Sequence, residues 1–179
     1  MRRLWISGAV LLSCILGVGS GWFLWQSEGN TRAPSAGSDV LQDEGVAEMS
    51  RYENGKYGFS FSHPASYTVT EMKDTGADIV LIRDAFGNAL QVAISPFDEP
   101  IATLTPERVR RDLPELVMKD VQEIVIDGMT PALSFIDPGK GLGATREAWF
   151  VSAGSLYQLS TYADSPSLLD GVLSSWQFK

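Results

Sequence analysis

Hydrophobic and polar residues divide the chain into an uncharged apolar run, a polar segment and a region of short alternating patterns. No residue from Leu4 to Trp25 is charged. At about 1.5 Å per residue, a helix over this run spans roughly 33 Å, enough to cross a bilayer. Residues 26–50 are rich in Ser, Gly, Asp and Glu and lack a helical or strand period, which predicts a flexible linker. We therefore expect a signal-anchor or transmembrane helix over 1–25, a linker over 26–50 and one domain over 51–179.

Four pairs of β-rich runs, each joined by a turn signal, predict four β-hairpins in the domain. The first turn contains Asn54-Gly55, and the second is the loop Asp84–Asn88. The predicted pairs are Tyr52 with Tyr57–Phe61, Ala77–Arg83 with Ala89–Ser95, Val121–Ile126 with Ala132–Ile136, and Thr145–Ser152 with Leu156–Tyr162.

Two helices are predicted between and after these hairpins. Thr105 and Pro106 form an N-cap and first-turn pattern, and Pro114 should kink or split the helix that follows. Ser165-Pro166 repeats the pattern before the last helix. The apolar positions at helical spacing are Val109, Leu113, Leu116 and Val117 in the first helix, and Leu168, Leu169, Val172, Leu173 and Trp176 in the second. Hairpins with two separate helices predict an α+β domain, an antiparallel β-sheet covered by helices.

Charge around the apolar run predicts its orientation. Arg2 and Arg3 precede it, and the excess of acidic residues behind the net charge of −8 follows it. The positive-inside rule places the N-terminus in the cytoplasm and the domain on the non-cytoplasmic side of the cell membrane. Trp5, Trp22 and Trp25 lie at the two ends of the run, where aromatic rings settle at headgroup depth. We expect a single-pass membrane protein.

Two other fates of the N-terminal run stay open. A cleaved signal peptide has a shorter apolar core and a small-residue site, for which only Ala33, Ser35 and Ala36 qualify. Lipidation at Cys14 would use Leu11–Cys14, which resembles a lipobox but is followed by further apolar residues. The length of the run favours an uncleaved anchor over both.

Small residues recur every fourth position in the apolar run. They are Ala9, Ser13, Gly17 and Gly21, and the last two form a GxxxG pair. Such a face lets two membrane helices approach closely and indicates a homodimer. The competing explanation is that glycine and serine are common in membrane helices generally.

Composition excludes several classes of function. An acidic domain without a basic, aromatic-rich stripe is not expected to bind nucleic acid. Cys14 is the only cysteine and His63 the only histidine, so an intrachain disulfide, a zinc cluster and a cysteine nucleophile in the domain are excluded. We expect His63 to end a strand, and we expect neither a cofactor nor a metal.

Candidate catalytic groups are few, and each has a simpler explanation. The loop 138–143 lacks the full phosphate-loop pattern, and strands follow it. Asp98 with Glu99, and Asp127 with Asp137, would suit glycosidase chemistry only if they converged in a cleft. Acidic residues beside turns are usually solvated.

Exposed aromatic side chains indicate binding more strongly than these acidic pairs. Among the aromatic residues near turns, Phe86 and Phe97 are the two for which we predict partner contacts.

Several segments of the domain resemble the PsbP-like (Mog1/PsbP) domains of anchored bacterial proteins over about Tyr52 to Lys179. The family pattern has Trp where this chain has Tyr67. The resemblance implies an α/β/α sandwich with an antiparallel sheet, an accessory or binding role, and no catalytic residues to transfer. The segments that carry it are Tyr57–Pro64 (YGFSFSHP), Trp149-Phe150, Leu156–Leu159 (LYQL) and Trp176–Phe178 (WQF).

Two functional hypotheses follow. The first is a non-enzymatic, membrane-tethered accessory or binding module that docks a protein or envelope partner. The alternative is a hydrolase that acts on an envelope substrate with carboxylates alone. A pair of carboxylates about 5–9.5 Å apart in a cleft would favour the hydrolase, and a shallow surface would favour the binding module.

Overall fold

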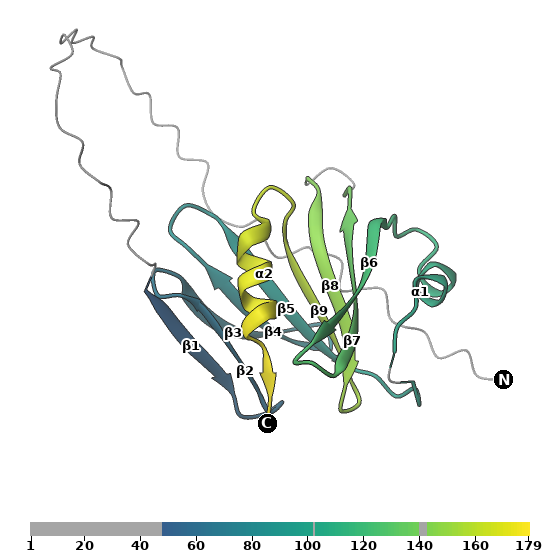
Figure 1. Ribbon diagram of the computed structural model, residues 1–179, viewed down its shortest axis with the longest axis horizontal. Helices are drawn as coiled ribbons and strands as arrows, with labels where there is room; N and C mark the ends of the chain where they lie inside the picture. Colours follow the sequence, from purple (N-terminus) through teal and green to yellow (C-terminus); the bar gives the residue numbers. More distant parts are fainter. Residues whose placement is uncertain (1–47, 102, 140–142) are drawn as a thin grey trace, which may run out of the picture. The chain divides into compact units, whose positions relative to one another are not determined.

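The computed structural model describes residues 48–101, 103–139 and 143–179, which form ten strands and two helices (Figure 1). The strands are β1 Met49–Asn54, β2 Phe59–Pro64, β3 Thr68–Asp74, β4 Ala77–Arg83, β5 Ala89–Pro96, β6 Lys119–Ile126, β7 Thr130–Asp137, β8 Thr145–Ser152, β9 Ser155–Tyr162 and β10 Gln177–Phe178. The helices are α1 Pro106–Asp112 and α2 Pro166–Ser175.

The strands form two antiparallel sheets. The large sheet has seven strands in the order β3-β4-β5-β9-β8-β7-β6, so β3 and β6 are its edges. The small sheet has the order β1-β2-β10 and joins the start of the domain to its C-terminus. The predicted antiparallel sheet with two helices is confirmed, and so are the four predicted hairpins.

Two strands were missed by the sequence prediction. Every second residue of β3 lies on the inner face of the sheet, and only the first of these residues is apolar; they are Val69, Glu71 and Lys73. Most of the strand is exposed. An edge strand with so little buried surface has no clear alternation of apolar and polar residues. β10 pairs with β2 through its two residues, Gln177 and Phe178. A strand of two residues is too short to show a periodic pattern in the sequence.

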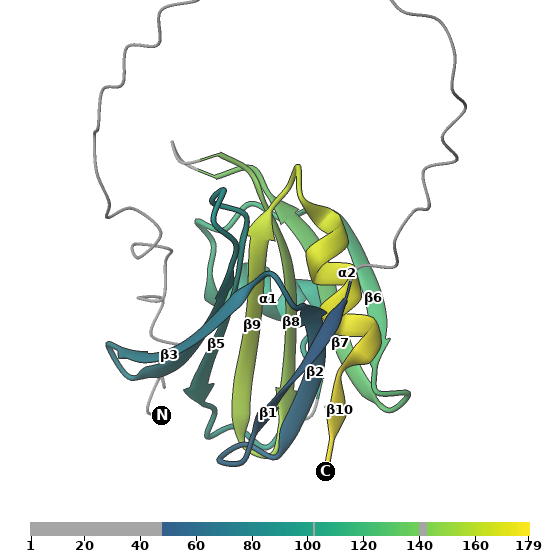
Figure 2. The same cartoon turned by 90° about the vertical axis from the view of Figure 1, so that its left-hand side faces the viewer.

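One face of the large sheet packs against α2 and the small sheet (Figure 2). Trp176, just after α2, stacks on Phe59 of β2 with 4.3 Å between ring centroids. The inner face of the large sheet contributes Tyr157 and Phe150 to the same aromatic core. Because burial of each large apolar side chain stabilises a fold by about 1.5–3 kcal/mol, this core joins the two sheets into one domain.

The opposite face of the large sheet is covered near β7, β8 and β9 by α1 and its flanking segments. Val109 of α1 and Leu104 pack on Leu133 of β7 and Trp149 of β8. Thr105 caps α1 as predicted, because its Oγ1 accepts from the backbone N–H of Arg108 at 3.2 Å.

The predicted length of the first helix was wrong. α1 ends at Asp112 rather than continuing past Pro114 to Val117. Proline lacks the N–H that an α-helix needs and clashes with the preceding turn, so the helix stops instead of kinking. Leu113 and Leu116 still pack on the apolar cluster, but from an irregular segment.

Several predictions concern residues outside the described ranges. They include the transmembrane helix over 1–25, most of the linker and the helix face of Ala9, Ser13, Gly17 and Gly21. β1 begins at Met49, within the range that the sequence assigns to the linker. None of the helices among the described residues has the length and apolarity to span a membrane.

Candidate functional site

Phe86 lies at the tip of the loop between β4 and β5, with 93% of its surface exposed. The Asp84 carboxylate shapes this loop. Its Oδ1 accepts from the backbone N–H groups of Phe86 at 2.8 Å and Asn88 at 2.9 Å, and its Oδ2 accepts from Asn88 Nδ2 at 2.6 Å. The hydrogen bond from the Asn88 side chain lowers the pKa of Asp84 most, and the backbone hydrogen bonds lower it further. The loop therefore presents the ring on a hydrogen-bonded frame, and the predicted partner contact of Phe86 stays a prediction.

The expected exposure of Phe97 was wrong. Only 6% of this residue is exposed, because it packs with Leu104, Trp149 and Leu156 under the segment that leads to α1. Its backbone N–H donates to the carbonyl of Gly154 at 2.8 Å, which fixes the residue beside the β8–β9 turn. An aromatic residue after a strand can cover the sheet rather than face a partner. Phe97 does so, because it packs on the apolar outer face of β8 and β9.

A groove of about 400 Å³ opens where the β1–β2 turn meets the β3–β4 hairpin. It is lined by Asn54, Lys56, Tyr57, Glu71, Met72, Lys73, Asp78, Ile79, Val80 and Ile94. The side chains of Val80 and Ile94 are buried in the core beneath it, and charged side chains form its rim. Its volume lies within the range of small-ligand sites.

Asn54 builds the turn on one side of the groove. Its Oδ1 accepts from the backbone N–H groups of Lys56 at 3.1 Å and Tyr57 at 3.0 Å, an Asx turn. Its Nδ2 donates to the Tyr52 hydroxyl at 2.8 Å, and that hydroxyl donates to Glu71 Oε1 at 2.7 Å. Burial, followed by the Glu71 hydrogen bond, raises the pKa of Tyr52 to about 12. The small sheet is thereby joined to edge strand β3.

Asp78 forms the second polar connection across the groove. Its Oδ2 accepts from the Tyr57 hydroxyl at 3.0 Å and forms an ion pair with Lys56 Nζ. Hydrogen bonding by Lys56, then by Tyr57, lowers the pKa of Asp78, and the same carboxylate raises the pKa of Lys56. The ammonium group also lies 4.8 Å from the centroid of the Tyr57 ring. The groove rim thus carries both signs of charge, already paired.

Glu71 and Asp78 are the two carboxylates of the groove. Glu71 is paired with Val80, and Asp78 with Lys73, so the two lie diagonally on one face of adjacent strands. Such diagonal positions are about 7–8 Å apart, which overlaps the spacing of glycosidase carboxylates. Glycoside cleavage needs one carboxyl group to hold a proton as the acid. The lowered pKa of Asp78 opposes that role.

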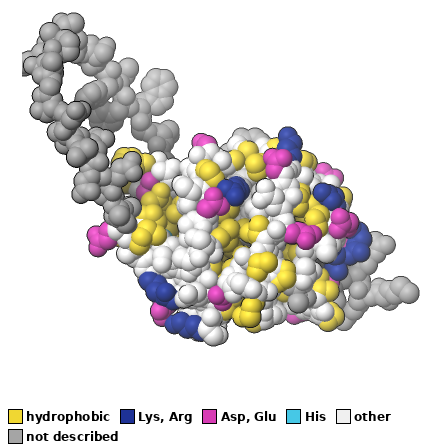
Figure 3. All heavy atoms as spheres, in the orientation of Figure 1, with side chains coloured by type: hydrophobic (Ala, Val, Ile, Leu, Met, Phe, Trp, Pro, Cys, Tyr) yellow, Lys and Arg dark blue, Asp and Glu magenta, His cyan; other side chains and the backbone are white. Residues whose placement is uncertain are grey.

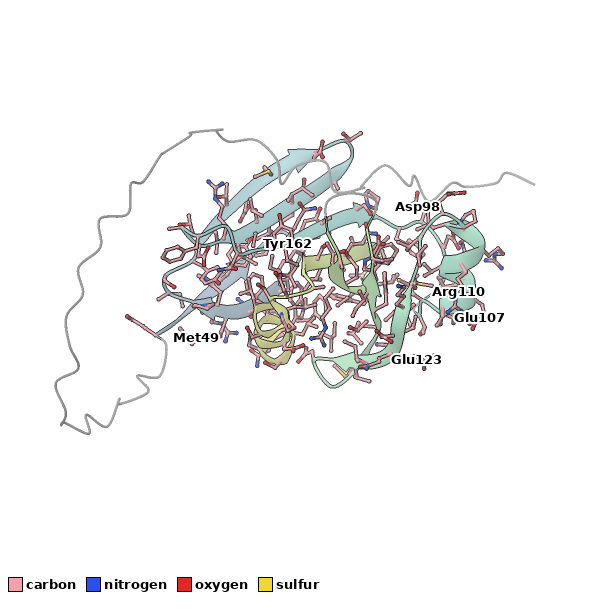
Figure 4. All side chains as sticks on the ribbon, turned by 90° about the horizontal axis from the view of Figure 1, so that it is seen from above. Met49, Asp98, Glu107, Arg110, Glu123 and Tyr162 are labelled. Atoms are coloured by element: carbon pink, nitrogen blue, oxygen red, sulfur yellow. The ribbon has the colours of Figure 1, made fainter. Side chains whose placement is uncertain are left out.

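The acidic pairs considered from sequence do not converge on a site. Glu99 pairs with Arg108 of α1, and Figure 4 places Asp98 near the same helix. Asp127 precedes β7 and Asp137 ends it, so the two lie at opposite ends of a strand. Asp127 Oδ2 accepts from the backbone N–H of Phe178 at 2.9 Å.

His63 lies in β2 as the predicted strand-end residue. It is buried, and its Nδ1 lies 2.9 Å from the carbonyl oxygen of Pro64. Within residues 48–101, 103–139 and 143–179, no three His, Cys, Asp or Glu residues are grouped to hold a metal.

Glu147 is a buried carboxylate that the sequence prediction missed. Its Oε1 accepts from Thr145 Oγ1 and Ser160 Oγ, each at 2.7 Å, and its Oε2 accepts from Trp149 Nε1 at 3.1 Å. Desolvation raises the pKa of Glu147, although the three hydrogen bonds act to lower it. The signal was an acidic residue on the buried face of an apolar strand, β8, flanked by Thr145 and Trp149 two positions away on either side.

Comparisons with known proteins identify the fold. No protein-family model matches the chain, and no curated protein matches it in sequence. The solution structure of cyanobacterial PsbP (CyanoP) from Synechocystis sp. PCC 6803 is similar to it, with a TM-score of 0.51 and 20% sequence identity over 82% of this chain and 98% of that chain. A crystal structure from Bacteroides thetaiotaomicron has a TM-score of 0.46 and 12% identity, covering 72% of this chain and 48% of that one. The likeness to CyanoP confirms the predicted PsbP-like fold of the domain.

Proposed function

We propose that this chain is a non-enzymatic accessory or binding module, tethered to the non-cytoplasmic face of the cell membrane, that docks a protein or envelope partner. The run from Leu4 to Trp25 and the arginines before it support the tether. A PsbP-like fold is compatible with this role, but a fold alone does not assign it. The groove between the β1–β2 turn and the β3–β4 hairpin is the observation that carries the proposal.

The groove suits an extended protein segment. Lys56 and Lys73 contribute positive charges to its rim, and Glu71 and Asp78 contribute negative ones. A segment with both signs of charge can match this rim, while an apolar side chain of the segment covers the floor. Mixed charges give specificity by complementarity, and they disfavour a uniformly charged ligand such as a phosphate backbone. Figure 3 shows acidic and basic side chains interspersed over the face of the domain that carries α2.

The hydrolase alternative rests on the spacing of Glu71 and Asp78. Both carboxylates already bind groups of the domain itself, Tyr52 and the Lys56–Tyr57 pair. A catalytic pair needs one member whose pKa is raised so that it donates a proton near neutral pH. Lys56 moves the pKa of Asp78 in the opposite direction, so Asp78 does not suit the role of the acid.

Charge reversal at the groove tests the proposal. The full-length chain with Lys56→Glu places a negative charge beside Asp78 and should lose the envelope partner that the unchanged chain captures from solubilised membranes. Lys119→Glu, at an exposed lysine of the distant edge strand β6, is the matched control and should retain that partner. Equal capture by both variants would exclude the groove. Turnover of a glycan or ester library that Asp78→Asn abolishes would establish the hydrolase instead.

A further inference from the structure

We propose that Phe86 inserts into the lipid surface beside the tether and so sets the orientation of the domain on the membrane. This inference rests on the proposed membrane tether. It assigns a lipid surface to the exposed aromatic ring for which the sequence predicted a partner, and it leaves the groove free for a protein.

Phe86 lies at the end of the domain where the chain enters. The carbonyl of Glu48, just before β1, accepts from the backbone N–H of Ala65 at 2.8 Å. After one further turn β3 begins, and its first residue, Thr68, pairs with Arg83 next to the Phe86 loop. Figures 1 and 2 show the β4–β5 loop and the start of β1 toward the same, upper side of the domain. The first residues that the structure describes and the Phe86 loop therefore lie toward the same end of the domain.

The groove lies toward the other end. β1 runs from Met49 to Asn54, and Asn54 begins the turn that borders the groove. β4 runs from Ala77, beside the groove, to Arg83, beside the loop. Contact of Phe86 with the bilayer would thus direct the groove away from the lipid, toward a partner.

Chain length permits this contact. Residues 26–47 separate the apolar run from the first described residue, and a coil of that length spans about 25 Å. β1, the six-residue strand that leads from Glu48 to the groove, is about 20 Å long. The linker therefore reaches the bilayer without being stretched, and the choice of this end as the contact surface rests on the exposed ring of Phe86.

The surroundings of Phe86 fit a lipid surface better than a protein pocket. The flanking residues of the loop are Asp84, Ala85, Gly87 and Asn88, so the ring does not belong to a broad apolar patch on this loop. A protein hot spot needs surrounding contacts that exclude water. One ring at headgroup depth needs none, and the tether converts its weak insertion into an intramolecular step.

The frame around Asp84 adds to this fit. It fixes the backbone at Phe86 and Asn88 before any contact, so little loop ordering is lost when the ring inserts. Charges of both signs lie at this end, Arg83 and Asp164 among the exposed ones. The inferred contact is therefore apolar and should persist at high salt.

A lipid-quenching experiment on the full-length chain tests the inference. An environment-sensitive fluorophore is placed on Ala85→Cys in a Cys14→Ser background, and the chain is reconstituted into phosphatidylcholine and phosphatidylglycerol vesicles. We expect a blue-shifted emission that spin-labelled lipid quenches and aqueous iodide does not. Phe86→Ser should abolish both effects. Met129→Ser, which removes another exposed apolar residue from the β6–β7 turn at the far end of β7, should leave both unchanged.

The outcomes separate this inference from the proposed function. If the chain floats with the vesicles but lipid does not quench the probe, or if Phe86→Ser is quenched like the parent, the lipid contact is wrong and the tether stands. If the probe is shielded only after envelope proteins are added, the ring binds protein and the inference is overturned. If the chain does not float with the vesicles, the tether fails, and this inference fails with it.

Discussion

Phe59→Ala would remove the side chain that joins the small sheet to the rest of the domain. Phe59 belongs to β2 and is fully buried. Its ring stacks on Trp176 after α2, at 4.3 Å and 12° between planes, and meets Tyr157 of the large sheet edge to face at 5.9 Å. One residue of the small sheet thus contacts both the end of α2 and the large sheet.

The expected cost follows from these contacts. Replacing a buried Phe by Ala costs about 3–5 kcal/mol through lost apolar burial and the cavity that remains. Each well-oriented aromatic pair adds about 0.5–1.5 kcal/mol, so a value near the upper end, about 4–5 kcal/mol, is expected. That is a large fraction of the 5–15 kcal/mol by which domains are usually stable.

Urea unfolding followed by far-UV circular dichroism measures this loss. With a slope of about 2 kcal/mol per molar urea, the midpoint should fall by roughly 2 M. Phe59→Leu keeps most of the volume and should lose less, which keeps the comparison informative if the Ala variant does not fold. Phe86→Ala, at the exposed ring, should stay within about 0.5 kcal/mol of the parent. A loss below about 1.5 kcal/mol for Phe59→Ala would refute the shared core of the two sheets.

Substitutions at three further positions test individual features of the fold. Thr105→Ala removes the N-cap of α1 and should cost about 1 kcal/mol in urea unfolding. Burial raises the pKa of Glu147 above its usual 4.5, so the folded protein holds this proton more tightly than the unfolded chain does, and stability should fall as pH rises from 4.5 through the raised pKa. Glu147→Gln should lack that decline. The same slope of stability against pH in both proteins would contradict the raised pKa of Glu147. Among the described residues Trp176 Nε1 has no hydrogen-bond partner, so Trp176→Phe should cost far less than the 3–5 kcal/mol of Trp176→Ala when their midpoints are compared.

Local chemistry made most of the fold predictable. Asn54-Gly55 predicted the first hairpin because its turn uses the Asn side chain and a left-handed glycine at Gly58, both local features. Thr105 and Pro106 predicted the start of α1 for the same reason. The end of that helix was missed because Pro114 competed with an apolar pattern that continued beyond it. The pattern reflects packing on the sheet, which Leu113 and Leu116 achieve without helix.

The groove was harder to predict because it depends on tertiary pairing. Asp78 and Lys56 are distant in the sequence, and only the placement of the start of β4 beside the β1–β2 turn brings their charges together. The exposure of Phe86 and the burial of Phe97 were hard to predict for the same reason, because both depend on tertiary contacts. Both are aromatic residues close to a strand end, and the sequence alone does not tell which of them has a neighbouring apolar surface to cover. The sheet face beside Phe97 supplies one, and the loop around Phe86 does not.

Photo-crosslinking from the groove in intact membranes tests the proposed binding role most directly. A photoreactive residue replaces Lys73, an exposed residue of the groove rim paired with Asp78, in the full-length chain. The account predicts a discrete adduct with one partner from this position, and none from the same residue at Lys119 on the opposite edge strand. Equal adducts from both positions, or an adduct from Lys119 alone, would contradict the claim that this groove docks the partner.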